Sequence, residues 1–462
     1  MSADVIVIGA GPAGLAAAAE AARRGLQVML LDEQPAPGGQ IYRALTRNTT
    51  AGADEPGILG KDYWRGRSLI EAIEGTDIEY VPGATVWTAE TDPLTVGYLV
   101  EDRTFLRAAR FLIIATGAYE RPVPIPGWTL PGVMTAGAAQ ILMKAEGAVL
   151  GGRIVLAGSG PLLQLVTCQL LKSGADVAGL LETTATQDYL AAARHLPRAL
   201  GARDLLLKGL DMRRTIKASG IPVHKGVKNL RCDGKNALES ISFESGGKPH
   251  RIEADLVLLH EGVVPHVQIS RLLNLSHEWF EAQRYWRPVL DDWGETSASG
   301  IFVAGDGAGI DGARAAEASG RIAALQVVAR LGALSKEDCD REAAAAFTQK
   351  KKEQRIRPLL DHLYSPPSHI VCPEDPSTIV CRCEEVRVRE IHACMETGCG
   401  GPNQLKAYSR CGMGPCQGRM CGLTVSELMA KHRGVTPDDV GYYRIRAPIK
   451  PIPLSALAAL EA

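Results

Sequence analysis

The sequence of 462 residues lacks the features that mark integral membrane, nucleic-acid-binding and secreted proteins. No uninterrupted apolar run approaches the ~18 residues of a membrane-spanning helix. Neither sign of charge dominates, because 51 Lys and Arg residues stand against 52 Asp and Glu residues, a net charge of −1. This balance gives no electrostatic reason to expect a nucleic acid or an anionic membrane as the main partner. The first residues carry no basic segment of a secretory signal, so we expect a cytoplasmic protein.

Cysteine is scarce in most of the chain and concentrated at one end. Only four of the 11 cysteines precede residue 381, whereas seven lie within residues 381–462. A disulfide scaffold would spread its cysteines through a short secreted chain. A cluster at one end of a long chain instead favours metal ligation or redox chemistry.

Short apolar runs alternate with stretches rich in Ala and Leu. The apolar runs have the length and composition of strands that are buried on both faces, and the other stretches favour helices. This alternation predicts an α/β fold built from βαβ units on parallel sheets. The predicted strands are residues 5–8, 28–31, 153–157, 177–181 and 301–304, and the predicted helices include residues 12–24 and 162–172.

The order of these elements predicts two dinucleotide-binding (Rossmann-like) units and a tail. Dividing the length by ~150 residues per domain suggests roughly three domains. The late strand at residues 301–304 resembles those of the first unit, so we expect it to complete that unit. Four prolines crowd residues 365–380 and predict a linker. The expected parts are a first domain from 1–125 and 290–345, a second from 126–289, a linker at 346–380 and a tail at 381–462.

The first predicted strand leads into Gly9-Ala10-Gly11-Pro12-Ala13-Gly14. The first glycine of such a motif allows a tight turn, the second lets the backbone approach a pyrophosphate, and the third lets the helix pack close to the strand. The N-terminus of the following helix stabilises the negative charge. Asp32 lies eighteen residues after Gly14 at the end of the second strand, where it can accept the ribose hydroxyls. This motif predicts a dinucleotide site.

Three further segments extend the candidate site. A glycine pair follows the second strand, a strand ends in Ala-Thr-Gly, and a late strand ends in Gly-Asp, where the carboxylate can bind a polyol chain. The candidate residues are Gly9, Gly11, Pro12, Ala13, Gly14, Asp32, Glu33, Gly39, Gln40, Val86, Ala115, Thr116, Gly117, Gly305 and Asp306.

Over residues 4–335 these motifs resemble those of the two-dinucleotide-binding-domain flavoproteins, the family of glutathione and thioredoxin reductases. The resemblance implies FAD held by the glycines of the first motif and by Asp32, with Asp306 on the ribityl chain. These reductases also need a reactive cysteine pair beside the flavin. No CxxC occurs in residues 1–380, which excludes disulfide reductase activity.

The second unit carries an incomplete motif, Gly158-Ser159-Gly160-Pro161-Leu162-Leu163. Leu163 occupies the position of the third glycine, where close helix packing disfavours a bulky residue. Glu182 lies nineteen residues further on at the end of the next strand, which suits an unphosphorylated ribose rather than NADP. Gly158, Gly160 and Glu182 are therefore candidates for binding NAD or another adenine nucleotide. A retained fold without a nucleotide is the alternative.

The tail carries Cys381-Arg382-Cys383, followed by Cys416 and Cys421. Two close pairs of thiolates suit a [2Fe–2S] cluster, because two cysteine sulfurs complete each iron. Four thiolates also bind zinc, which is the main alternative. Cys394, Cys399 and Cys411 are left over, and Cys411 is close enough to be a rival ligand.

The tail is similar, over residues 378–435, to the bacterioferritin-associated ferredoxin-like [2Fe–2S] domain, a small helical module. This resemblance implies a [2Fe–2S] cluster held by Cys381, Cys383, Cys416 and Cys421. The usual second pair in that family is CxxC, and the longer CxxxxC matches a variant fused to flavoproteins.

The whole order of motifs resembles the large-subunit family of bacterial opine oxidases, D-hydroxyproline dehydrogenase and hydrogen cyanide synthase, together with part of the sarcosine oxidase alpha subunit. The matching stretches are residues 32–43, 117–122 and 410–419. The resemblance implies an FAD-dependent amine-oxidase-like partner subunit that oxidises the C–N bond of an amino acid or opine. It also leads us to expect an FMN at a subunit interface and a further small iron–sulfur subunit.

On this basis, electrons from the partner pass through flavin and [2Fe–2S] in this chain to an acceptor. Two alternatives stay open: a stand-alone NADH-dependent flavin/[2Fe–2S] oxidoreductase, and a non-enzymatic ferredoxin-like binding module. No catalytic residue can be identified from the sequence.

Overall fold

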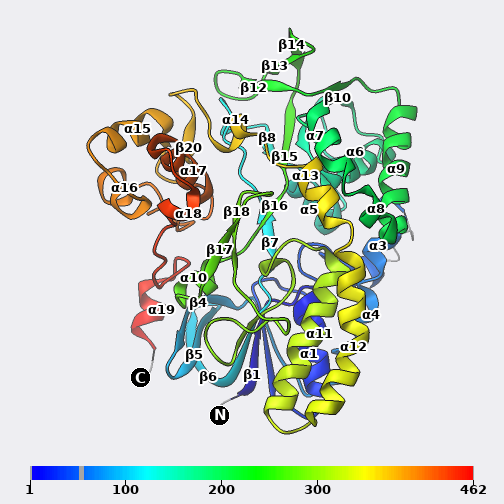
Figure 1. Ribbon diagram of the computed structural model, residues 1–462, viewed down its shortest axis with the longest axis vertical. Coiled ribbons are helices and arrows are strands. Elements are labelled where there is room, and N and C mark those ends of the chain that lie inside the picture. The colour runs from blue at the N-terminus through cyan, green and yellow to red at the C-terminus, as the bar shows by residue number, and fades with distance from the viewer. Residues whose placement is uncertain (1–2, 51–56, 461–462) are drawn as a thin grey trace.

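The computed structural model describes residues 3–50 and 57–460, and its first sheet is built around the N-terminal strand (Figure 1). The strands β1 (Ala3–Ile8), β2 (Val28–Asp32), β3 (Glu79–Pro82), β6 (Arg103–Ile114) and β19 (Ile301–Val303) are parallel, in the order β3-β2-β1-β6-β19. Strand β19 pairs with β6, so a late segment of the chain completes this sheet.

Both faces of the first sheet are covered. Alternate residues of a strand point to opposite faces, and Val5 and Val7 of β1 pack against α1 (Pro12–Arg23). Helix α1 packs on α11 (Ala313–Arg330), and α11 packs on α12 (Lys336–Glu353). The opposite face, with Ile6 and Ile8, is covered by β4 (Thr85–Thr91) and β5 (Leu94–Val100), which form an antiparallel meander with the first half of β6.

The second sheet is also parallel, and it is followed by a small antiparallel sheet. Its order is β11-β10-β9-β15-β8. The strands are β8 (Val133–Thr135), β9 (Ile154–Ser159), β10 (Val177–Glu182), β11 (Val223–Lys225) and β15 (Leu256–Glu261). One face packs against α5 (Ala136–Glu146), α6 (Pro161–Lys172) and α9 (Arg203–Ala218). The other face packs against β12 (Lys228–Asp233), β13 (Ser240–Ser245) and β14 (Lys248–Glu253). The predicted fold class is thereby confirmed.

A two-stranded ribbon joins the two units. It pairs β7 (Ala118–Glu120) with β16 (Val263–Pro265) in antiparallel fashion. A hairpin of β17 (His277–Phe280) and β18 (Tyr285–Pro288) then leads back to the first sheet. The shorter helices are α2 (Leu45–Thr50), α3 (Lys61–Trp64), α4 (Arg67–Glu71), α7 (Thr186–Ala193), α8 (Leu196–Ala199) and α10 (Gln268–Leu272).

The segment predicted as a linker is folded onto both units, through α12 on the first and through the following helices on the second. Residues 346–353 are the last turns of α12, and α13 (Arg357–Leu363) and α14 (Ser368–Val371) follow. The side chain of Gln283 donates to the carbonyl groups of Asp361 and Tyr364, which fixes the end of α13. These contacts hold the end of α13 against the turn between β17 and β18, so the segment is not a free tether.

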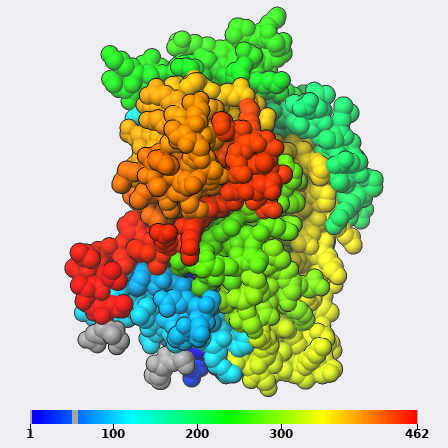
Figure 2. Space-filling model, turned by 60° about the vertical axis from the view of Figure 1, so that its left-hand side comes forward, coloured from blue at the N-terminus to red at the C-terminus, as the bar shows by residue number. Residues whose placement is uncertain are grey.

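The tail is helical and shares an apolar core with the first unit. Its elements are β20 (Ile379–Cys381), β21 (Val386–Arg387), α15 (Val388–Glu396), α16 (Pro402–Ser409), α17 (Gly422–Arg433) and α18 (Pro437–Val440). The chain then returns to the first unit through α19 (Leu454–Ala458), where the Ile449 amide donates to the carbonyl of Trp87 at 2.9 Å. Figure 2 shows this C-terminal segment, in red, lying over the blue first unit. None of the helices in the described ranges has the length and apolarity to cross a membrane.

Candidate functional site

The first glycine motif forms the loop between β1 and α1. A Cβ at Gly9 would lie 2.5 Å from the carbonyl oxygen of Ala115, and one at Gly14 would lie 1.7 Å from the carbonyl oxygen of Gly9. Both positions therefore require glycine. Gly39 approaches Gly11 so closely that its Cβ would lie 2.8 Å from the Gly11 Cα. Helix α1 begins at Pro12 without a side-chain cap, which leaves its N-terminal N–H groups for an anion.

Asp32 ends β2 beside this loop. Its Oδ1 accepts from the amide of Gln34 at 3.3 Å, whereas Oδ2 is buried with no hydrogen-bond partner in the described part of the chain. Burial raises the pKa of Asp32 to about 6. An orphaned buried carboxylate oxygen at a strand end is what a ribose hydroxyl would satisfy. The neighbouring Glu33 instead forms an ion pair with Lys450 of the C-terminal segment.

Thr116, Gly117, Gly305 and Asp306 lie at the carboxyl ends of the parallel strands, whereas Val86 lies buried in the antiparallel strand β4. Thr116 Oγ1 donates to the carbonyl of His266 at 3.3 Å, and the Asp306 Oδ1 accepts the amides of Asp311 and Gly312, each at 3.0 Å. Burial raises the pKa of Asp306. Ligands of open α/β sheets bind at this edge. The glycine cradle and the unsatisfied carboxylate therefore fit a dinucleotide such as FAD.

Lys144 is a buried residue at this site that the sequence analysis missed. Its Nζ donates to the carbonyl of Gln40 at 3.2 Å and to Oε1 of Gln140 at 2.8 Å. Burial and the nearby Arg43 lower the pKa of Lys144 to about 7. The side chain joins α5 of the second unit to the loop that carries Gly39 and Gln40, and no local pattern in the sequence distinguishes it from a surface lysine.

The second glycine motif forms an equivalent loop between β9 and α6. A Cβ at Gly158 would lie 1.8 Å from the carbonyl oxygen of His260, so this turn also requires glycine. Leu163 is 1% exposed and packs in the helix core of the second unit. Glu182 ends β10, is buried, and already accepts from Gln164 Nε2 at 3.3 Å. The predicted residues of this site lie together, but its acid has an internal partner.

Three acid–base residues beneath the second loop were not predicted as site residues. The Nδ1 of His260 lies 2.7 Å from Oε1 of Glu120, and Oε2 of Glu120 accepts the amide of Gly137 at 2.9 Å. Glu261 accepts from Ser159 Oγ at 2.9 Å and Thr183 Oγ1 at 2.7 Å.

Burial raises the pKa of Glu261 to about 7. The only feature of the sequence that could have indicated these three residues is the ionisable pair His260 and Glu261 at the end of an apolar strand.

The cysteines of the tail form two neighbouring groups. The sulfurs of Cys381, Cys411 and Cys421 all lie within 4.8 Å of one another and are buried. The thiols of Cys383 and Cys416 contact each other nearer the surface. The pKa of Cys381 is lowered to about 2 because the thiols of Cys411 and Cys421 donate hydrogen bonds to its sulfur. Thiolates of this kind are ligands that soft metals prefer.

All four predicted ligands therefore lie in the two groups, and Cys411 joins the buried one. The hydroxyl of Tyr443 donates to Cys411 Sγ at 3.4 Å and lies 3.7 Å from Cys421 Sγ. The Tyr443 ring packs on Gly412 and Gly418, where a Cβ would lie 2.6 and 2.5 Å from ring atoms. The glycines of this loop therefore make room for a tyrosine beside the sulfurs. Five sulfur donors suit an iron–sulfur cluster and also suit zinc.

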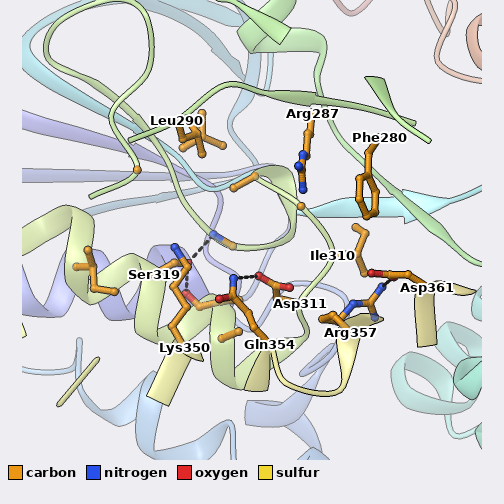
Figure 3. A pocket seen from close by; sticks show the side chains of 18 of the residues that line it. Phe280, Arg287, Leu290, Ile310, Asp311, Ser319, Lys350, Gln354, Arg357 and Asp361 are labelled. Carbon is orange, nitrogen blue, oxygen red and sulfur yellow. Dashed lines mark hydrogen bonds and ion pairs between the residues drawn. The ribbon is translucent and has the colours of Figure 1, made fainter. Parts of the chain in front are cut away.

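A cavity of about 290 Å³ lies next to the Asp306 loop. Figure 3 shows Phe280 and Arg287 on one side and Lys350, Gln354 and Asp311 on the other. Gln354 Nε2 donates to Asp311 Oδ2 at 2.7 Å. Lys350 has no ion pair within the described ranges, so this cavity offers an unpaired positive charge.

Comparison with known families gives two matches that together span most of the chain. Residues 3–320 match the model of the pyridine nucleotide-disulphide oxidoreductase family. Residues 375–461 match the model of the sarcosine oxidase A3 domain. The first match covers the two nucleotide loops, and the second covers the cysteine-rich tail.

Comparison with individual proteins gives similarity over nearly the full length. The chain is 45% identical to the A subunit of opine oxidase from Agrobacterium tumefaciens, over 99% of this chain and 92% of that protein. It is 34% identical to hydrogen cyanide synthase subunit HcnB of Pseudomonas aeruginosa, over 98% of each chain. Among solved structures, L-proline dehydrogenase from P. horikoshii has a TM-score of 0.73 at 18% identity, over 99% of this chain and 79% of that one, which shows a shared fold.

Proposed function

Because the chain belongs to the pyridine nucleotide-disulphide oxidoreductase family and to the group of opine oxidase A subunits, we propose that it is the electron-transfer subunit of a heteromeric oxidoreductase. The complex would oxidise the C–N bond of an amino acid or opine. The observation that carries this proposal is the 45% identity to the opine oxidase A subunit over 99% of the chain. The resemblance of the sequence motifs to the same group of subunits implies the same function.

In this proposal FAD occupies the first glycine loop. Bound FAD would accept two electrons and release them singly. The backbone at Gly9, Gly11 and Gly14 would hold its pyrophosphate, and Asp32 would bind the ribose through the oxygen that lacks a partner. Asp306 would bind the ribityl chain.

The tail would carry a [2Fe–2S] cluster that exchanges single electrons. The ligands of this proposal are Cys381, Cys383, Cys416 and Cys421. The separation of the thiols into a buried group and a more exposed pair supports two irons with two cysteines each. Cys411 in the buried group is the rival ligand, and zinc is the rival metal.

Two further ligands belong to the proposal. The second glycine loop, with Gly158, Gly160 and Glu182, would bind NAD or another adenine nucleotide. FMN at a subunit interface is a family expectation, and the cavity beside Asp306 supports it through the unpaired charge of Lys350. A Lys350→Ala variant of the complex should then lose FMN while retaining FAD.

The partners would be a small iron–sulfur subunit together with an FAD-dependent subunit that resembles amine oxidases. The first relatives are named as subunits, which supports a heteromeric complex. A cytoplasmic location and the domain limits given from the sequence are parts of the same proposal.

The deciding experiment is spectroscopy of this chain purified apart from its proposed partners, because those partners would contribute flavin and iron–sulfur signals of their own. We expect flavin absorbance and, after reduction, the EPR signal of a [2Fe–2S] cluster. Cys416→Ser should abolish the EPR signal and leave the flavin, whereas Cys411→Ser should leave both. Zinc without iron would refute the cluster.

Rapid bleaching of the flavin by NADH in the isolated chain would favour the stand-alone oxidoreductase. Protein that retains the cluster but never contains flavin would favour the ferredoxin-like module.

A further inference from the structure

Strand β7 runs from the Thr116-Gly117 segment of the candidate FAD site towards the loop that carries Cys416 and Cys421. It begins directly after Thr116 and Gly117. The hydroxyl of Tyr119 donates to the carbonyl oxygen of Arg419 at 3.0 Å. Arg419 lies between Cys416 and Cys421. A continuous path of covalent bonds and one hydrogen bond therefore runs from Thr116 and Gly117, which are candidate FAD-site residues, to the segment between Cys416 and Cys421.

The paired strand β16 follows the same course. The amide of His266 donates to the carbonyl of Gly117 at 2.9 Å. Two residues further on, Gln268 Nε2 donates to the carbonyl of Gln417 at 3.4 Å. The rings of His266 and Tyr119 meet edge to face, with centroids 5.8 Å apart. Strand β7 and the residues that follow β16 thus both bond to the segment between Cys416 and Cys421. The hydrogen bond from Tyr119 is shorter than the one from Gln268.

Buried contacts hold this ribbon in place. The guanidinium of Arg121 donates to the carbonyls of Glu261 and Arg284, each at 3.1 Å. Arg284 in turn forms a bidentate ion pair with Glu427 on α17 of the tail. Burial raises the pKa of Tyr119, so its hydroxyl keeps the proton that it donates. The Tyr119 contact is therefore fixed by packing around it.

We propose that Tyr119 is the positioning residue that couples the flavin of the first unit to the cluster of the tail. The inference depends on the proposed function, because it needs both cofactors. Electron tunnelling weakens steeply across gaps between atoms and much less along bonds, so a hydrogen bond that closes a gap speeds the transfer.

The electron balance leaves the tyrosine unchanged. A reduced flavin bound in the first unit would give up two electrons one at a time and release two protons to water. Each electron would reduce an oxidised cluster by one, and a one-electron acceptor such as ferricyanide would then take that electron from the cluster. The Tyr119 hydroxyl forms and breaks no covalent bond in this sequence.

The test uses this full chain purified apart from its proposed partners, which would carry flavin and iron–sulfur groups of their own. The variant Tyr119→Phe removes the hydroxyl and keeps the buried ring. Tyr442→Phe is the matched control, because the Tyr442 hydroxyl donates to the carbonyl of Gly418 in the same loop at 3.3 Å, but from a residue outside strand β7. A light pulse with a photosensitiser and a sacrificial donor reduces the flavin. Rapid freezing then times the appearance of the EPR signal of the reduced cluster.

We expect Tyr119→Phe to slow cluster reduction several-fold, with flavin content, iron content and the midpoint potential of the cluster unchanged. Tyr442→Phe should reduce its cluster at the wild-type rate. Unchanged kinetics in Tyr119→Phe would overturn the inference. Equal slowing in both variants, or a shifted cluster potential in Tyr119→Phe, would overturn it too, because the hydroxyl would then only shape the loop. The absence of an EPR signal in the wild-type chain would instead refute the proposed function.

Discussion

The two glycine loops of this protein have similar backbones and different surroundings. Each follows a buried parallel strand, and a Cβ at its first glycine would collide with a neighbouring carbonyl oxygen. The first loop packs its helix through Gly14 and leaves an oxygen of Asp32 without a partner. The second packs its helix through Leu163, and its acid, Glu182, is already bonded to Gln164. The first loop therefore keeps a carboxylate oxygen free for a ligand, whereas the acid beside the second loop already has a hydrogen-bond partner within the protein.

The largest expected effect comes from Gly14→Ala in the first loop. The added Cβ would lie 1.7 Å from the carbonyl oxygen of Gly9, so the loop must move and the pyrophosphate position is lost. We expect purified protein without FAD, measured as the ratio of flavin absorbance to protein. Full flavin occupancy in this variant would contradict the assignment of the first loop.

The matched change in the second loop, Leu163→Ala, should act on stability and leave the flavin in place. Truncation of a buried leucine to alanine costs about 2–5 kcal/mol, and Leu163 is fully buried. We expect a lower denaturant midpoint for the second unit with FAD content unchanged. A loss of FAD as large as that of Gly14→Ala would remove the contrast between the two loops.

The pH dependence of the stability of the flavin-free protein tests whether Asp32 is buried without a hydrogen-bond partner for one oxygen. The folded-state pKa of Asp32 is about 6, above its ordinary value of 3.8, mainly because of burial. Below pH 4 the carboxyl group is protonated in both the folded and the unfolded state, and its burial is tolerated. As the pH rises through about 6, ionisation lowers the free energy of unfolding by about 3 kcal/mol.

We expect Asp32→Asn to remove this pH dependence, to raise the free energy of unfolding at pH 7 and to weaken FAD binding. Unfolding curves of flavin-free protein at pH 4 and pH 7 measure the first two effects. The quantity to compare is the difference in the free energy of unfolding between wild type and Asp32→Asn. If this difference is the same at pH 4 and pH 7, the carboxylate of Asp32 is not buried without compensation.

The smallest effect concerns the acid of the second loop. Gln164→Leu removes a hydrogen bond to Glu182, which is worth about 1 kcal/mol. Glu182 would then resemble Asp32, and we expect NAD to bind a few-fold more tightly, as measured by titration calorimetry. The absence of any NAD binding in wild type and variant would favour another ligand, or none, in the second unit.

Much of this architecture was predictable because it depends on local patterns. The strand at residues 5–8, the helix that begins at Pro12 and the strand at residues 301–304 were all predicted within one or two residues of β1, α1 and β19. Short apolar runs and Ala-rich helices contain their own periodicity. The strand-end positions of Asp32 and Glu182 followed from the same pattern.

Other parts of the candidate sites could not be predicted. Lys144 reaches the first loop from α5, and Glu120 reaches His260 across 140 residues of sequence. Such pairs are brought together by the packing of one unit on another, which leaves no periodic signal. Spacing alone made Cys411 a rival ligand, and only the folded chain places its sulfur in the buried group with Cys381 and Cys421.

The sequence by itself determined where the chemistry can occur: glycines where the backbone must turn tightly, acids at strand ends and cysteines at one end of the chain. These features are local, because each depends on the conformation of a few consecutive residues. The tertiary structure decided how the sites are connected. Tyr119 and Arg419 are 300 residues apart in sequence, and only the shared core of tail and first unit brings them within hydrogen-bonding distance.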